Sequence, residues 1–283
     1  MLGIPTISYL PADDVDDTAL PAGELIQHLE DDVDGWWVSA TRYDETIEIR
    51  IYDVATVWLD TSLQFCTVRP AFEVGEGWLR FQLERHLLPI VRMLRGHAVF
   101  HAGAVHTSRG AVLLLADGHG GKSTTTALLL ADGADFISDD QTAVTAALEA
   151  IGTPWLRLRQ PSADLAPAGA DTRVEGDGRT AIALDCPPEP DPIAGLLLLG
   201  ERSSTDTVTL EPVAGAAAVT ALLGQVFCAG LVDAALVERH FIVATELAAG
   251  LPVARLAVPH GPPWPTVLPH IERWLAGYGS ADE

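Results

Sequence analysis

The sequence has few basic residues and few cysteines. Its 283 residues include 17 lysines and arginines against 39 aspartates and glutamates, which gives a formal net charge of -22. So acidic a surface repels a phosphodiester backbone at long range, and we therefore expect no nucleic acid among the partners. Cys66, Cys186 and Cys228 share no CxxC spacing. They indicate neither a disulfide framework nor a zinc site.

Long apolar runs are also missing. The longest, AVLLLA at 111–116, is far shorter than the about 20 residues that a membrane-spanning helix needs. The first residues, MLGIPTISYLPADDVDD, are acidic and do not resemble a signal peptide. We therefore expect a cytoplasmic protein with no membrane partner. With 48% apolar residues, the chain can form a substantial core, as one large domain or as a catalytic domain with an accessory domain.

The first part of the chain, residues 1–76, carries β-strand patterns. Ile47, Ile49 and Ile51 alternate with polar side chains, as in a half-buried strand. The acidic runs in this part are typical of solvated loops. We predict a smaller β-rich N-terminal module.

Residues 77–95 place leucines on one helical face and predict a connecting helix, which Pro89 is expected to bend or split. Residues 96–283 alternate between strand and helix patterns, which is typical of an α/β domain. Within it, the Pro-, Gly- and Asp-rich stretch 161–192 predicts a long loop that could serve as a mobile lid or a substrate loop.

A glycine-rich loop with one lysine follows the strand pattern AVLLLA. Four residues separate Ala116 from Gly121-Lys122-Ser123, which fits the P-loop pattern with alanine at its first position. In such a loop, backbone N–H groups converge on phosphate oxygens, the lysine spans the β- and γ-phosphates, and the hydroxyl ligates Mg²⁺. The helix pattern STTTALLLADG would aim its positive end at the same place. The alternative is a glycine-rich turn with a surface lysine.

We therefore predict a P-loop that binds ATP and Mg²⁺. Within it, His119 either faces solvent or touches a phosphate. The predicted nucleotide-binding residues are Asp117, Gly118, His119, Gly120, Gly121, Lys122, Ser123 and Thr124.

Two adjacent aspartates, Asp139 and Asp140, close the strand pattern ADFIS. Ligand-facing residues gather at such strand ends in α/β sheets. Adjacent side chains on an extended backbone point in opposite directions, so the two carboxylates are expected to have different roles. One would hold Mg²⁺ together with Ser123, and the other would reach an acceptor hydroxyl. The sequence does not assign these two roles, and an acidic turn that caps a helix is the structural alternative.

These motifs, with a histidine upstream, resemble the catalytic domain of bacterial HPr kinase/phosphorylase, a P-loop group akin to phosphoenolpyruvate carboxykinase. In that family a histidine followed by a small residue precedes the P-loop, and an Asp-Asp pair ends the strand after the P-loop helix. This chain has FHAGAV, then ADGHGGKST, then FISDD. Ala116 follows His101 by 15 positions, and Asp139 follows Ser123 by 16. The resemblance covers residues 96–145, about a fifth of the chain.

The resemblance implies an HPr kinase/PEP carboxykinase-like fold, and an activity on a serine hydroxyl. It also implies that His101 supports the aspartate that acts as general base. Relatives are often oligomeric, which suggests a homo-oligomer. The chain departs from the pattern at Ala116, at Thr124, where the bifunctional enzymes carry an acid, and in lacking their downstream Glu-x-Arg-Gly signature. These departures leave phosphorylase activity and recognition of HPr open.

After the aspartates, GTPWLRLR predicts a strand with Arg157 and Arg159 on the same side. The two side chains would clamp a phosphate or a substrate carboxylate, or else form surface salt bridges.

Our hypothesis is a Mg²⁺-dependent kinase that transfers the γ-phosphoryl group of ATP to a hydroxyl of a peptide, a protein or a small molecule. The alternatives are a nucleotide-binding module without transfer, as in a sensor or assembly partner, and a simple ATPase. The short spacing to a doubled aspartate favours the kinase. The predicted catalytic residues are Asp139, Asp140, His101 and Lys122, and the predicted metal ligands are Ser123, Asp139 and Asp140.

Overall fold

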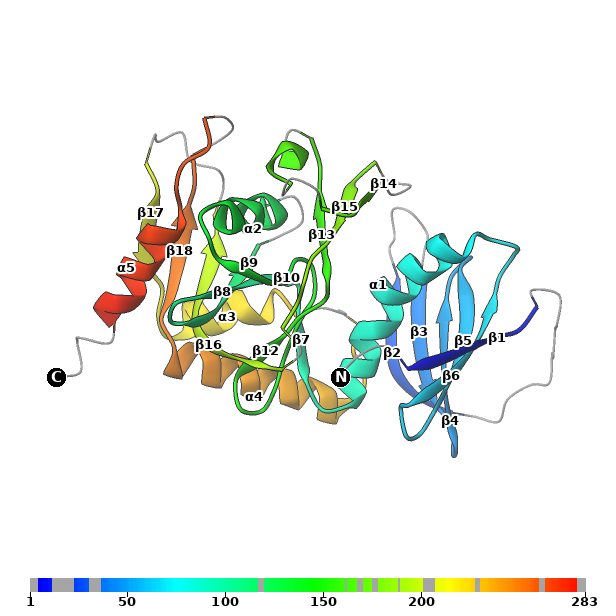
Figure 1. Cartoon of the computed structure of the whole chain (residues 1–283). Coiled ribbons are helices and arrows are strands. Elements are labelled where there is room, and N and C mark those ends of the chain that lie inside the picture. Colours follow the sequence, from blue (N-terminus) through cyan, green and yellow to red (C-terminus); the bar gives the residue numbers. More distant parts are fainter. Residues whose placement is uncertain are drawn as a thin grey trace. The chain divides into compact units, whose positions relative to one another are not determined.

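The computed structural model of the chain describes residues 5–11, 23–30, 37–116, 120–160, 162–166, 170–174, 178–187, 189–200, 207–226, 230–259 and 263–278. It divides into two compact units, Met1–Ala98 with Cys228–His240, and Val99–Phe227 with Phe241–Glu283 (Figure 1). Several sheets and few helices make up a mixed α/β structure. No helix in the described ranges has the length and apolar character to span a bilayer.

The first unit is built around a six-stranded sheet of order β1-β6-β5-β4-β3-β2, antiparallel except that β1 runs parallel to β6. In β4, Ile47, Ile49 and Ile51 are buried, as their alternation predicts. Glu48 on the opposite face is buried as well, and it accepts a hydrogen bond from Arg50 Nε at 2.7 Å. The strands are β1 (Thr6–Tyr9), β2 (Glu24–Glu30), β3 (Trp37–Arg42), β4 (Thr46–Ile51), β5 (Ala55–Asp60) and β6 (Phe65–Pro70).

A 19-residue helix, α1 (Glu76–Leu94), follows this sheet in the chain. Its apolar face is buried, including Leu79, Leu83 and Leu87. Pro89 lies inside the helix without splitting it. An interior proline costs a helix about 3 kcal/mol, and each fully buried leucine contributes about 1.5–3 kcal/mol, so burial of this face outweighs the proline.

The second unit contains a mixed sheet of nine strands. Its order is β10-β8-β9-β16-β12-β11-β7, and β18 pairs with β16 and with β17. β9, β16 and β18 run parallel, whereas β8 is antiparallel to both β9 and β10. The strands are β7 (Ala98–Phe100), β8 (Ala102–Thr107), β9 (Gly110–Leu115), β10 (Asp135–Ser138), β11 (Thr142–Val144), β12 (Glu149–Ile151), β16 (Asp191–Leu199), β17 (Thr209–Pro212) and β18 (Val253–Ala257).

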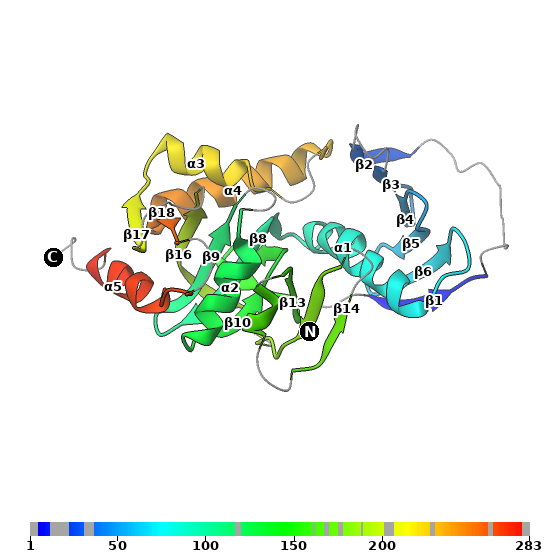
Figure 2. The same cartoon turned by 90° about the horizontal axis from the view of Figure 1, so that it is seen from above.

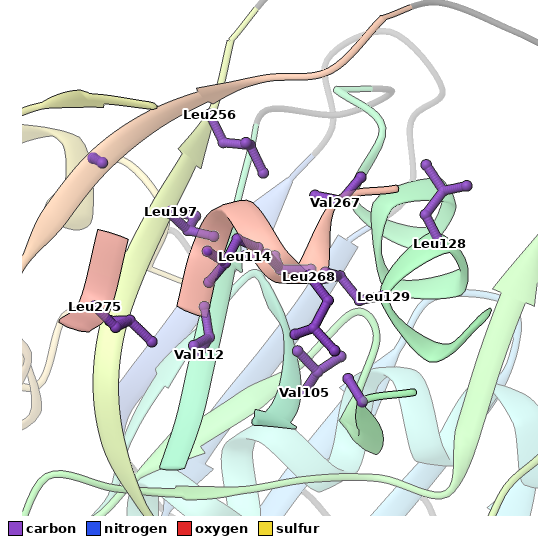
Figure 3. Close-up of a cluster of buried hydrophobic side chains, with 13 residues drawn as sticks. Val105, Val112, Leu114, Leu128, Leu129, Leu197, Leu256, Val267, Leu268 and Leu275 are labelled. Carbon is purple, nitrogen blue, oxygen red and sulfur yellow. The ribbon is translucent and has the colours of Figure 1, made fainter. Parts of the chain in front are cut away.

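Helices α2 (Lys122–Ala131) and α5 (Leu268–Tyr278) pack on β8, β9, β16 and β18 through one buried apolar cluster (Figure 3). Leu128 and Leu129 enter it from α2, and Leu268 and Leu275 enter it from α5. This cluster supports the C-terminal half of α2. The other helices are α3 (Ala216–Leu223) and α4 (Ala234–Gly250).

A small antiparallel sheet has the order β13-β15-β14, and two of its strands, β14 and β15, together with a short 3-10 helix, come from 161–192, where a long loop was predicted. Its apolar side chains pack with α2 and β10, so the described part of 161–192 is folded structure, and the prediction of a long loop is wrong. The elements are β13 (Trp155–Leu158), η1 (Ser162–Leu165), β14 (Thr172–Val174) and β15 (Thr180–Ala183).

Candidate functional site

The predicted phosphate loop joins β9 to α2. β9 ends at Leu115 and α2 begins at Lys122, so the strand and the helix expected on either side of the loop are present. Gly121 has a φ of 88°, a left-handed conformation that glycine adopts without strain. The first N–H groups of α2 have no acceptor within the helix and are donors for a ligand at this end. Three predicted loop residues lie outside the described residues: Asp117, Gly118 and His119.

Lys122 is the only lysine in the chain. It is buried, and its Nζ donates a hydrogen bond to the backbone oxygen of Ala116 at 2.6 Å. This bond crosses the loop from the start of α2 to the end of β9. Burial of an ammonium group is costly unless oxygen atoms compensate it. The position of the single lysine is therefore itself a sequence signal for an anion site.

Asp139 is almost completely buried, with 1% of its surface exposed. Its Oδ2 accepts hydrogen bonds from Ser123 Oγ at 3.0 Å and from the backbone N–H of Arg157 at 2.9 Å. Its Oδ1 is buried and has no hydrogen-bond partner among the residues that the structure describes. Burial, together with the charge of Asp140, raises the pKa of Asp139 to about 7, against the opposing effect of the Arg157 and Ser123 contacts.

Asp140 lies in a different environment. Its Oδ1 is 3.4 Å from Nδ1 of His101, and the two side chains are 27% and 31% exposed. The main chain of His101 is fixed by a hydrogen bond from its N–H to the oxygen of Gln225 at 2.6 Å. The two neighbouring carboxylates thus have different partners, one a hydroxyl in the first turn of α2 and the other a partly exposed imidazole.

The oxygen atoms around Asp139 suit a hard divalent cation. Mg²⁺ takes oxygen ligands, and proteins usually hold it by one or two carboxylates together with substrate phosphates. Oδ1 of Asp139 is a buried carboxylate oxygen without a partner in the described ranges, and Ser123 Oγ adjoins the same carboxylate. These residues fit the predicted ion. Among the described residues, no cluster of three or more His, Cys, Asp and Glu side chains could hold a metal ion by itself.

The two predicted arginines are placed differently. Arg157 lies within β13, where its backbone N–H binds Asp139 and its positive charge lowers the pKa of that carboxyl. Arg159 comes after the end of the strand at Leu158, and it is exposed. Leu156 and Leu158 are buried, and Arg157 and Arg159 alternate with them, so the expectation that both arginines project from one side stays a prediction. Of the two, Arg157 is the one that the fold brings to the aspartates.

Thr124 and Ser162 link α2 to η1. Their hydroxyl oxygens lie 2.7 Å apart, and Ser162 is buried. The link holds the segment after β13 against the first turn of α2. Sequence analysis missed Ser162, because a serine in a Pro- and Gly-rich stretch belongs to no motif.

A groove borders α2 on the side of β16 and β18. Sequence analysis missed the groove residues at the ends of β16 and β18, because isolated apolar residues carry no functional pattern. The lining residues are Gly120, Gly121, Thr124, Thr125, Leu128, Leu199, Gly200, Leu256, Val258, Pro259 and Trp264.

Comparisons with known proteins give only distant likenesses, among solved structures. No protein-family model matches the chain, and no curated protein matches it in sequence. Among solved structures, it is similar to the Hpr(Ser) kinase/phosphatase from Coxiella burnetii, with 12% identity and a TM-score of 0.31. That match covers 65% of this chain and 96% of the other.

Proposed function

We propose that the chain is a Mg²⁺-dependent kinase that transfers the γ-phosphoryl group of ATP to a hydroxyl group. The observation that carries the proposal is the hydrogen bond from Ser123 Oγ to Asp139 Oδ2 at the N-terminus of α2. It brings a carboxylate to the helix end that would receive the phosphates. Asp140, a second carboxylate with its own imidazole partner, follows directly in the chain.

The loop and the start of α2 would hold the triphosphate. Gly120, Gly121 and the first residues of the helix would supply N–H donors, and Lys122 would supply positive charge beside them. Thr124 and positions 117–119 complete the proposed phosphate site. The net charge of the chain is strongly negative, so binding of an anion depends on such local donors.

Ser123 and Asp139 would hold Mg²⁺. The hydroxyl and the buried carboxylate are adjacent, and Asp139 Oδ1 has no partner in the described structure. When bound, Mg²⁺ neutralises negative charge on the phosphates and aligns them for in-line transfer. The sequence left Asp140 as an alternative metal ligand. We assign it the role of general base instead.

Asp140 would act as the general base. Its carboxylate would accept the proton of the acceptor hydroxyl while the hydroxyl oxygen bonds to the γ-phosphorus. The bond from that phosphorus to the β–γ bridging oxygen breaks, and ADP leaves. His101 Nδ1, 3.4 Å from the carboxylate, would orient Asp140 for this transfer. Arg157, beside Asp139, would contact a phosphate or an acidic group of the acceptor. Arg159, which is exposed, would contact the same groups from the edge of the site.

The acceptor is expected to be a serine of a peptide or protein, or a small-molecule hydroxyl. The test is to incubate the purified chain with Mg-ATP and candidate acceptors, and to follow ADP release and acceptor mass together. A kinase yields one modified acceptor, heavier by one phosphoryl group, for each ADP. ADP without a modified acceptor would identify an ATPase instead, and nucleotide binding without ADP would identify a binding module.

A further inference from the structure

The groove beside α2 starts at the loop glycines. A ligand with its phosphates at the N-terminus of α2 can therefore place the rest of its structure in the groove. On α2, the lining consists of Thr124, Thr125 and Leu128, whose spacings of three and four residues put them on one helical face. The facing wall is formed by residues at the ends of the parallel strands β16 and β18, and Trp264 belongs to the same lining.

The strand order separates this groove from the aspartates. The sheet runs β10-β8-β9-β16, with β18 beyond β16, and the loop follows β9 in the middle (Figures 1 and 2). Asp139 and Asp140 follow β10 on one side of the loop, whereas the groove lies at the ends of β16 and β18 on the other. A molecule bound across the loop has one end at the carboxylates and the other in the groove. A nucleoside triphosphate has this layout, with its terminal phosphate and its base at opposite ends.

The chemistry of the lining suits a flat, uncharged ring. None of its residues, all within the described ranges, carries a charged side chain. Leu128 and Leu256 belong to the buried cluster under α2 and α5, so the wall of the groove is part of the core (Figure 3). Trp264 packs against the same cluster and presents an indole close to the phosphate loop. Aromatic and apolar surfaces of this kind bind ring systems by stacking.

The segment that carries Trp264 is anchored to α2. Asp132, at the C-terminal end of α2, accepts hydrogen bonds from the backbone N–H groups of Val267 at 2.5 Å and Leu268 at 3.0 Å. These donors belong to the start of α5, where helix geometry leaves N–H groups without acceptors and favours a carboxylate. The anchor lies three residues after Trp264 and fixes the main chain that leads from Trp264 into α5.

We propose that this groove binds the base of a purine nucleoside triphosphate by stacking and apolar contact, without discriminating adenine from guanine. The proposal rests on the proposed function, because the phosphates must occupy the loop. Thr124 and Thr125 are the hydroxyl side chains of the lining, and a hydroxyl either donates or accepts a hydrogen bond. The Thr124 hydroxyl is already paired with Ser162, which leaves Thr125 as the hydroxyl for the base. No amide or charged side chain in the described lining is set to distinguish one purine. GTP therefore replaces ATP, whereas the smaller pyrimidine ring binds more weakly.

Calorimetric titration with Mg-ATP, Mg-GTP, Mg-CTP and Mg-tripolyphosphate tests the proposal. We expect similar dissociation constants for ATP and GTP, both about ten- to a hundredfold below that of tripolyphosphate, the range that stacking of one base supports. Equal affinities for all four compounds would overturn the base site and leave the loop as a phosphate site. A strong preference for ATP over GTP would overturn the claim that the groove binds adenine and guanine equally well. Failure of every compound to bind would overturn the proposed function as well.

Variants of Trp264 identify the stacking surface. Trp264→Phe keeps an aromatic ring and is expected to keep most of the affinity for ATP. Trp264→Leu removes the ring and is expected to weaken ATP binding about tenfold while leaving tripolyphosphate binding unchanged, which also shows that the loop is folded. Trp274→Leu is the matched control, because Trp274 packs against the same buried cluster but does not line the groove. An equal effect of the two leucine variants on ATP affinity would overturn the assignment of Trp264 as the base contact.

Discussion

Ser123 donates a hydrogen bond of 3.0 Å to Asp139, 16 positions later in the chain. Ser123 lies in the first turn of α2, and Asp139 follows β10, so the bond connects the phosphate loop to the strand that carries both aspartates. It depends on the pairing of β10 with β8, which sets where the end of β10 lies. The site is thus assembled by sheet register and not by sequence proximity.

The single lysine offers a direct chemical test of the loop. An acyl-phosphate derivative of ATP transfers its acyl group to an amine beside the bound phosphates. We expect one modification at Lys122, located by peptide mass spectrometry and suppressed by excess Mg-ATP. Lys122→Ala should lower phosphoryl transfer by about a hundredfold or more, as loss of a preorganised charge donor does elsewhere. Labelling of Lys122 that persists in excess Mg-ATP would argue against phosphates at this loop.

Replacement of Asp140 separates its role from that of a metal ligand. Asp140→Asn removes the proton acceptor, and we expect transfer to slow by about 10²- to 10⁴-fold with unchanged affinity for Mg-ATP. His101→Ala should have a smaller effect, since the base stays in place and loses only its partner at 3.4 Å. Initial rates and calorimetric binding check both. If Asp140→Asn weakened Mg-ATP binding and left the turnover rate intact, Asp140 would be the metal ligand instead.

Asp139→Asn should stabilise the protein while it removes Mg²⁺-dependent activity. Asparagine keeps an oxygen acceptor for Ser123 and for the N–H of Arg157, and it removes a buried negative charge next to Asp140. We expect a gain of about 1–3 kcal/mol in the free energy of unfolding, measured in urea at pH 8 with EDTA. Asp140→Asn serves as the control, with a smaller gain because Asp140 is partly exposed. A loss of stability in Asp139→Asn would indicate a structural carboxylate.

His86 in α1 gives the first unit a dependence on pH. Burial, with a smaller effect of Arg85, lowers the pKa of His86 to about 4. A histidine in an unfolded chain has a pKa of about 6.5. Between this pKa and that of His86 in the folded chain, the unfolded chain binds a proton that the folded chain does not. Stability is therefore lost as the pH falls from about 6.5 towards about 4.

His86→Gln should reduce this loss, measured by urea unfolding at pH 7 and at pH 5. His28→Gln in the same unit is the control, because the His28 side chain is 47% exposed. The control should keep the pH dependence of the original protein. Identical pH dependence in His86→Gln would mean that His86 is already protonated in the folded state.

The strand and the helix around the loop could be predicted because each carries its own local pattern. AVLLLA is a short buried run, and STTTALLLADG has helical periodicity with a glycine stop. The partners of the two aspartates could not be predicted in the same way. Asp139 is covered by the main chain of β13, through the N–H of Arg157, and such coverage depends on a contact between distant segments. The sequence shows two adjacent aspartates of equal standing, and only their burial in the fold distinguishes Asp139 from Asp140.

The small sheet and the groove were missed for related reasons. Strands of three and four residues, such as β14 and β15, are too short to show alternation within a Pro- and Gly-rich stretch. Their apolar side chains become informative only after β13, β15 and β14 pair. The groove draws its residues from several separate segments, and Trp264 stands outside every motif. Sequence patterns identify chemistry within one segment, whereas the fold creates surfaces from many.

The carboxylate of Asp132 joins the far end of α2 to the first N–H groups of α5. A chain shortened before Val267 would lose more than a terminal helix, because Asp132 would be left without both donors and the apolar cluster shared with α2 would be opened to water. The C-terminal helix therefore supports α2, and we expect truncations near it to disturb the proposed phosphate loop at the start of α2 as well.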